Sequence, residues 1–195
     1  ASIVPAPAAS SASAASSSPA ASNESESITS SPKSTTADTK PTPAAIGTEV
    51  KFKNVSGSGT FTGAMKVVEV IRGKDAWDKI IASYANNPKP SEGYEFAVVK
   101  VRVTIDSIEK NVNDKDEGVC LYNVAFKSFT GDYKEISDNS YASTPKPAWV
   151  NSTLLKVGDT KEANMVFVVK KDDPSPKMGF NVEYDGTGYW FALTK

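Results

Sequence analysis

The sequence predicts an all-β protein, an antiparallel β-sandwich with one short inserted α-helix. Three observations indicate this class. Short segments of apolar and β-branched residues recur along the chain with turn residues between them. Residues 99–105 alternate between apolar and polar side chains, which is the period of a half-buried strand. One stretch, about Asp75–Ala85, instead spaces its apolar residues as an amphipathic helix does.

The chain is expected to divide at Gly47. Residues 1–46 contain no aromatic residue, hold six of the 12 prolines and consist mainly of Ser, Ala, Pro and Thr. Such a segment cannot bury enough apolar surface to offset the entropy lost on ordering it. We therefore expect a disordered, partly polyproline tether, followed by one folded domain over residues 47–195, which hold all the Trp, Tyr and Phe residues.

The first half of the folded part is expected to hold two strands, the helix and a third strand. Val50 and Phe52 indicate the first strand, and the β-branched residues 66–71 indicate the second. Asp75 can cap the helix and Pro88 ends it. The buried stripe of the helix would consist of apolar residues three and four positions apart: Ala76, Trp77, Ile80, Ile81 and Tyr84.

The second half is expected to complete the sandwich. Residues 108–118 are polar and acidic and predict a loop. Residues 119–129 predict a strand with Cys120, Tyr122, Val124 and Phe126 on one face. The remaining expected elements are a turn at 130–132, an irregular segment at 137–148, a turn at 157–159, a strand with Met165, Phe167 and Val169 inward, a loop at 172–177, and a final strand pair at 180–184 and 189–193.

Several strings of the sequence resemble one family. RGKDAW, the NNPKP segment, GYEFAVVKVRV, LKVGDTKEANMVFVV and the closing GYWFAL are similar to a bacterial family of extracellular immunoglobulin-like lipoproteins of unknown function (DUF 4352). The resemblance covers roughly residues 47–195 and implies an immunoglobulin-like β-sandwich, a secreted or surface-anchored location and no known enzymatic activity. A lipoprotein of this kind would carry its lipidated Cys upstream of Ala1. The family supplies no functional residues to transfer.

The composition argues against several classes of function. The net charge is −1 and the folded part has no basic surplus, so nucleic acid is not an expected partner. The chain has no His, which removes His-dependent nucleophiles and His-ligated zinc. The single Cys120 cannot form an internal disulfide, and we expect it to be a small buried core residue. The sequence therefore predicts no catalytic residues and no cofactor.

The acidic loop is a candidate calcium site. Asp114, Asp116 and Glu117, with Asn111 and Asn113 before them, place oxygen ligands at alternating positions that could surround Ca²⁺. The pattern departs from an EF-hand loop, because a lysine interrupts it and the glycine comes after it. A solvated loop between strands is the favoured alternative.

Two aromatic residues on the irregular segment are candidate ligand contacts. Trp149 and Tyr141 lie close to Pro145 and Pro147, and an aromatic side chain on a loop can anchor a peptide or a glycan. The alternative, which we favour, is that Trp149 fills one end of the sandwich.

The function expected from these observations is non-covalent binding by a secreted or surface-tethered module. The partner would be a protein or a cell-wall component, and any membrane attachment would be through an N-terminal lipid. A structural spacer of the cell envelope is the main alternative. A hydrolase that depends on paired carboxylates is a lesser one.

Overall fold

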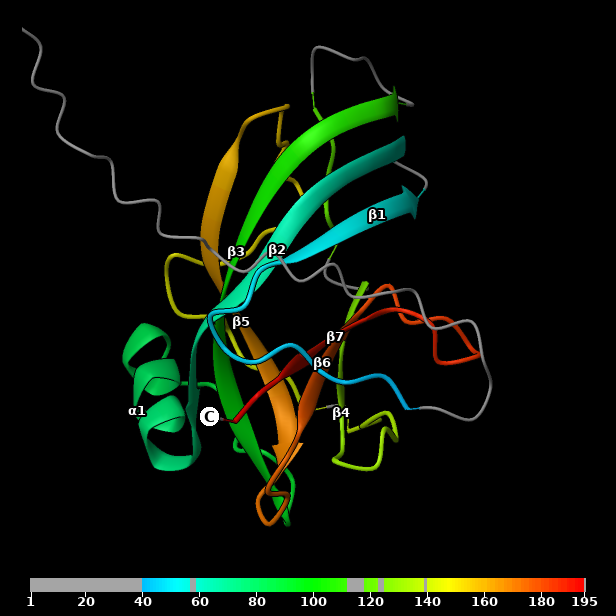
Figure 1. Cartoon of the computed structure of the whole chain (residues 1–195). Helices are drawn as coiled ribbons and strands as arrows, with labels where there is room; N and C mark the ends of the chain where they lie inside the picture. The colour runs from blue at the N-terminus through cyan, green and yellow to red at the C-terminus, as the bar shows by residue number, and fades with distance from the viewer. Residues whose placement is uncertain (1–39, 57–58, 112–117, 123–124, 139, 195) are drawn as a thin grey trace, which may run out of the picture.

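The computed structural model describes residues 40–194, except for 57–58, 112–117, 123–124 and 139. These residues form seven strands and one α-helix (Figure 1). In chain order, the elements are β1 (Val50–Ser56), β2 (Gly59–Arg72), α1 (Gly73–Ser83), β3 (Tyr94–Asn111), β4 (Phe126–Phe129), β5 (Thr160–Lys170), β6 (Lys177–Phe180) and β7 (Tyr189–Ala192).

The strands form two antiparallel sheets that pack as a sandwich, as predicted. One sheet has the order β1-β2-β3-β5 and the other has the order β4-β6-β7. The order β2-β3-β5 corresponds to strands A, B and E of an immunoglobulin fold, and β4-β6-β7 corresponds to strands C, F and G. Strand β1 is an additional edge strand, and strand D has no counterpart in the described residues.

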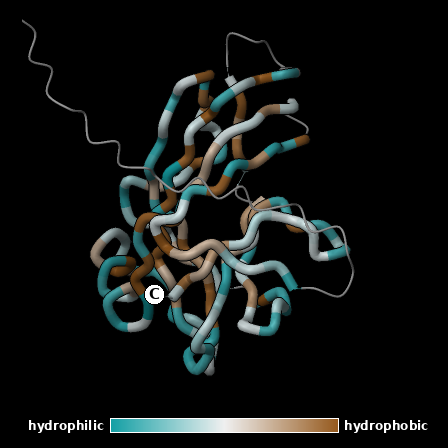
Figure 2. The backbone as a smooth tube through the Cα atoms, in the orientation of Figure 1, coloured by the Kyte–Doolittle hydropathy of each residue, from teal (hydrophilic) through white to brown (hydrophobic). Residues whose placement is uncertain are grey.

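The core lies between the two sheets. Val99, Val101 and Val103 of β3 are fully buried, whereas Lys100 and Arg102 lie on the opposite face and pair with glutamates, so the predicted alternation of this strand is confirmed. Phe180 of β6 joins the sheets, with its ring centroid 5.2 Å from that of Phe52 on β1. Figure 2 shows the hydrophobic residues concentrated along the strands and hydrophilic residues at the loops.

A second, smaller core lies under α1 on the outer face of the larger sheet. Ala76 and Ile80 are fully buried against Phe96 and Val98 of β3, and Trp77 stacks on Phe96 at 6.1 Å. The helix runs over Gly73–Ser83 and not over the predicted Asp75–Ala85. It begins earlier because Gly73 takes a positive φ of 64° directly after β2.

The C-terminal end of α1 also differs from the prediction. The Asn87 side-chain amide donates to the carbonyls of Ile80 and Tyr84, which satisfies the orphan carbonyls of the last turn before Ala85 is reached. Tyr84, predicted to be in the buried stripe, is 52% exposed.

The predicted boundary between β3 and β4 is wrong. Strand β3 continues to Asn111, beyond the predicted loop start at residue 108, because it pairs with β2 as far as Gly59. Before β4, Val119 makes only an isolated bridge to Leu155, so residues 119–122 belong to neither sheet. Cys120 is buried as expected, Tyr122 is exposed, and Val124 lies outside the described residues.

The predicted strand at residues 180–184 is also wrong. Strand β6 ends at Phe180, because Asn181 takes a positive φ of 49°, which turns the chain away after a last hydrogen bond from Asn181 N–H to Ala125 O at 2.9 Å. The predicted partner strand is confirmed as β7, and the turns at residues 130–132 and 157–159 are present.

Residues 41–46, which the sequence analysis assigned to the tether, are part of the folded domain. We call this segment the strap. Ala44 pairs in parallel with β7, donating its N–H to Trp190 O and accepting from Ala192 N–H, both at 2.8 Å. Ala44 and Ile46 pack on the main core, so the domain begins near Pro41 and not at Gly47. Residues 1–39 of the predicted tether lie outside the described residues.

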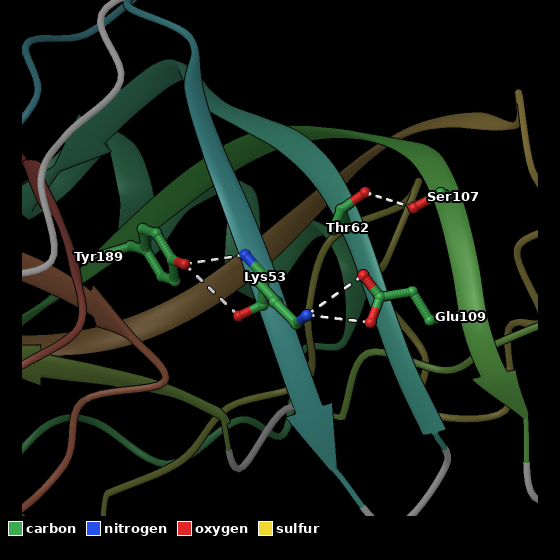
Figure 3. A network of polar contacts seen from close by, with 5 residues as sticks. All are labelled: Lys53, Thr62, Ser107, Glu109 and Tyr189. Atoms are coloured by element: carbon green, nitrogen blue, oxygen red, sulfur yellow. Dashed lines mark hydrogen bonds and ion pairs between the residues drawn. The ribbon is translucent and has the colours of Figure 1, made fainter.

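The free edge of β1 is closed in its middle by a side chain. The Tyr189 hydroxyl accepts a hydrogen bond from Lys53 N–H at 2.8 Å and lies 3.4 Å from Lys53 O (Figure 3). The Lys53 ammonium reaches across β2 to the Glu109 carboxylate, 2.9 Å away. Beside this ion pair, the hydroxyls of Thr62 on β2 and Ser107 on β3 are 2.7 Å apart. Paired polar groups therefore lie on this part of the outer face, across β1, β2 and β3.

Candidate binding site

Trp149 is a core residue and cannot contact a ligand in this structure. Only 4% of its surface is exposed, its ring packs against Phe126, and its indole N–H donates to Leu121 O at 2.9 Å. Its predicted role in ligand binding is therefore wrong, and its surroundings agree with the packing role that was the alternative.

Tyr141, the other predicted contact, is 81% exposed. It lies in the segment that follows β4, which is fastened to the loop after α1. The Ser140 and Ser91 hydroxyls are 3.1 Å apart, and Ser143 N–H donates to Asn87 Oδ1 at 2.7 Å. Tyr84 is also exposed, and it lies close to this junction, since Asn87 N–H donates to its carbonyl at 3.2 Å.

The predicted calcium ligands Asp114, Asp116 and Glu117 lie outside the described residues. In the part of the chain that the structure describes, no group of three or more acidic, Cys or His residues is arranged to hold a metal ion.

Three loops meet at one end of the sandwich, the lower end in Figure 1. Tyr94 of β3 pairs with Lys170 of β5, and Phe129 of β4 pairs with Lys177 of β6. These pairs bring the ends of four strands together. The loops there are residues 84–93, 130–143 and 171–176, and we call this region the loop end.

The loops of the loop end are tied together by buried or half-buried polar groups. The Asp173 carboxylate accepts from Gly131 N–H at 2.7 Å and from Ser175 N–H at 2.9 Å. Arg72, at the end of β2, donates to the carbonyls of Asp173 and Lys170 and pairs with Glu95 at 2.9 Å. Contacts to main-chain atoms of this kind fix the course of a loop.

Lys177 adds a buried tie between the same two turns. Its ammonium group donates to Gly131 O at 2.7 Å and to Ser175 O at 2.9 Å, and lies 4.4 Å from the centroid of the Tyr133 ring. Only 6% of Lys177 is exposed, and this burial lowers the pKa of its ammonium group. Burial also raises the pKa of Tyr133, whose hydroxyl donates to Pro41 O of the strap.

A cavity of about 470 Å³ opens between these turns. Its lining is mostly small or charged, and comprises Gly93, Thr130, Gly131, Asp132, Lys134, Lys170, Asp172, Asp173, Pro174 and Ser175. Three carboxylates and two lysines therefore face it from two turns that are far apart in sequence.

Asp138, close to this region, is held ionised by its neighbours. Hydrogen bonds from Ser140 and Ser91 lower the pKa of its carboxyl group. A carboxyl group of this kind is poorly suited to act as a general acid near neutral pH.

Sequence reasoning predicted a ligand contact at Tyr141 and gave no indication of the cavity. The acidic and basic residues of the two turns have a sequence pattern that is typical of ordinary solvated loops. Their meeting depends on Asp173 and Lys177, whose partners lie 42 and 46 positions away. The residues around Lys177 give no sequence signal that this lysine is buried. Its burial follows from its place at the start of β6, where it pairs with Phe129 of β4.

In comparisons with known proteins, no family model matches the chain, and neither a curated protein nor a solved structure matches it. Within the described residues, no helix has both the length and the apolar character needed to cross a membrane.

Proposed function

We propose that this chain is a non-catalytic binding module whose ligand contacts lie at the loop end. The observation that carries the proposal is a cavity framed by cross-linked loops, at the end of the sandwich whose loops also carry the exposed Tyr84 and Tyr141. Concave sites with a few fixed polar groups are where proteins usually bind their ligands. Loops held on a rigid scaffold commonly carry such contacts.

The proposed setting is extracellular. The resemblance to immunoglobulin-like surface lipoproteins and the composition of the first 40 residues support a secreted or surface-tethered protein, whose partner is a protein or a cell-wall component. The same features would suit a structural spacer, which would need no ligand at the loop end.

A capture experiment with paired variants tests the proposal. The full chain is immobilised and exposed to an extract of bacterial cell envelopes beside a Tyr84→Ala/Tyr141→Ala variant. The matched control is Tyr122→Ala/Tyr184→Ala, which removes two exposed tyrosines at the opposite end of the sandwich. We expect capture to be lost only with the loop-end pair. Equal capture by all three forms, or none by any, contradicts the proposal.

A further inference from the structure

Four of the five charged side chains that line the cavity are exposed, the exception being Asp173. Asp132, Asp172, Lys134 and Lys170 are exposed, and among the described residues none of the four makes an ion pair. By contrast, charged residues on the outer face of the larger sheet are paired, as Arg102 is with Glu162 at 2.8 Å. The charged groups of these four residues are therefore available to form hydrogen bonds with a ligand.

The charge of the groups left free around the cavity is balanced. Of the three lining carboxylates, Asp173 already accepts hydrogen bonds from two main-chain N–H groups. The other two, Asp132 and Asp172, are matched by the lining lysines Lys134 and Lys170. Phosphates and other strong anions are recognised by a surplus of Arg and Lys, and a cation requires a surplus of carboxylates. The free groups show neither surplus, so the cavity is matched to a ligand without net charge.

The rim offers donors and acceptors in alternation. Asp132 and Asp172 can only accept hydrogen bonds when ionised, Lys134 and Lys170 can only donate, and the hydroxyls of Thr130 and Ser175 can do both. A hydroxyl group on a ligand both donates and accepts. A ligand with many hydroxyl groups can therefore satisfy an acidic and a basic neighbour at once.

An exposed aromatic ring lies on a loop that is bonded to the loop of Gly93. Gly93 lines the cavity, and Ser91 lies within hydrogen-bonding distance of Ser140, next to the 81%-exposed Tyr141. A tyrosine ring combines an apolar face with a polar tip, and so can contact the C–H face of a ring that also carries hydroxyl groups.

From these observations we propose that the loop end binds a neutral carbohydrate, with hydroxyl groups held by Asp132 and Asp172 and a sugar ring against Tyr141. This inference rests on the proposed function and names its ligand class. The turns are already held in place by Asp173, Arg72 and Lys177 before a ligand binds. Binding therefore costs little further conformational entropy in these loops.

Calorimetric titration of the full chain tests the inference. The probes are neutral hexasaccharides of β-1,4-linked glucose, α-1,4-linked glucose and β-1,4-linked N-acetylglucosamine, with oligogalacturonate as the anionic comparison. We expect at least one neutral probe to bind. An Asp132→Asn/Asp172→Asn variant should raise its Kd by about tenfold or more, because each substitution removes a charged acceptor.

The matched control is Asp78→Asn/Asp106→Asn, which makes the same change in net charge on exposed residues away from the cavity. It should leave the Kd unchanged, and the melting temperatures of both variants establish that the fold is intact. The carbohydrate assignment is overturned if only oligogalacturonate binds or if no probe binds. It is also overturned if the control variant weakens binding as much as the Asp132→Asn/Asp172→Asn variant does.

The capture experiment separates this inference from the function on which it rests. If no oligosaccharide binds but envelope capture still depends on Tyr84 and Tyr141, the carbohydrate assignment is wrong and the binding module stands. If capture also fails, both are wrong.

Discussion

At the scale of single residues, the loop end depends on a buried cation. Lys177 satisfies the carbonyls of Gly131 and Ser175, which otherwise would lose their partner, and its alkyl stem lies in the core region. The cost is desolvation of the ammonium group, which is the reason that its pKa is lowered. Two hydrogen bonds to carbonyls and the Tyr133 ring offset that cost.

Replacing this lysine should loosen both turns. We expect Lys177→Met to lower the free energy of unfolding by about 1–3 kcal/mol, because two carbonyls lose their donor. Chemical denaturation of the variant measures the change. Lys134→Met, which alters an exposed lysine of the same turn, should change stability by less than about 0.5 kcal/mol. Equal effects from the two variants would contradict the assigned role of Lys177.

Asp138 makes stability depend on pH. Hydrogen bonds from Ser140 and Ser91 hold its folded-state pKa below the ordinary value of 3.8, so its ionised form stabilises the folded state above that pH. As the pH falls through 3.8 towards the folded-state pKa, this contribution is lost. The difference in unfolding free energy between the unaltered chain and Asp138→Asn should be constant above about pH 5 and shrink below pH 3.8. A difference that is constant down to pH 2.5 would contradict this assignment.

At the scale of elements, the strap shows how a short segment can belong to a fold without any marked sequence pattern. Residues 41–46 add to the edge of β7 through Ala44, and Gly47 N–H donates to Val67 O of β2 at 2.8 Å. The strap thus pairs with the smaller sheet, and the residue that follows it bonds to the larger sheet. Its two prolines and its alanines resemble the preceding residues, which is why composition placed the boundary too late.

A pair of shortened chains tests the strap. A chain that begins at Lys40 should melt at the same temperature as the full chain. A chain that begins at Gly47 should lose the two hydrogen bonds of Ala44 and the packing of Ile46, at a cost of about 2–4 kcal/mol. For a domain of this size, that cost corresponds to about 5–12 °C in thermal melting. Equal melting temperatures for the two chains would show that the strap adds nothing.

The same scale shows which elements the sequence could predict. The alternation of residues 99–105 identified the centre of β3, since one face is core and the other is solvated. The run of residues 119–129 was equally apolar but is divided between a bridge to Leu155 and the four-residue β4. Periodicity indicates that such residues are buried. It does not show which segment they pair with, because that depends on the tertiary structure.

The candidate site was less predictable than the fold, for a related reason. Trp149 and Tyr141 lie eight positions apart on one irregular segment, yet one is buried and the other is exposed. No regular period applies to such a segment, so burial there depends on neighbours such as Leu121 and Phe126, which the sequence does not place.

At the scale of the whole molecule, the exposed edges of both sheets are guarded. The strap pairs with β7, Trp149 and Pro147 bond to Asn164 of β5, and Tyr189 closes β1 at Lys53. Ile136 N–H likewise donates to Ser128 O of β4. Open edges are the usual route by which β-proteins associate through their backbones, so this domain is protected against such pairing.

Removing the hydroxyl group that protects the β1 edge should therefore make the protein associate faster. Tyr189→Phe keeps the ring beside Phe52 but deletes the hydroxyl that occupies the Lys53 edge. We expect this variant to associate faster on mild heating than the unaltered chain, as followed by light scattering. The control is Tyr184→Phe, which removes a hydroxyl from a fully exposed residue and should have no effect. Association at the same rate in all three proteins would contradict the guarding role.

The parallel pairing of the strap with β7 has a mechanical consequence. The two segments run in the same direction, so a pull on the chain before the strap and an opposite pull on the chain after β7 draw them past each other along their length. The two hydrogen bonds of Ala44 are then loaded in shear and must break together, whereas an antiparallel pair held by adjacent ends opens one bond at a time. The force at which the domain first yields is therefore set where the strap lies against β7.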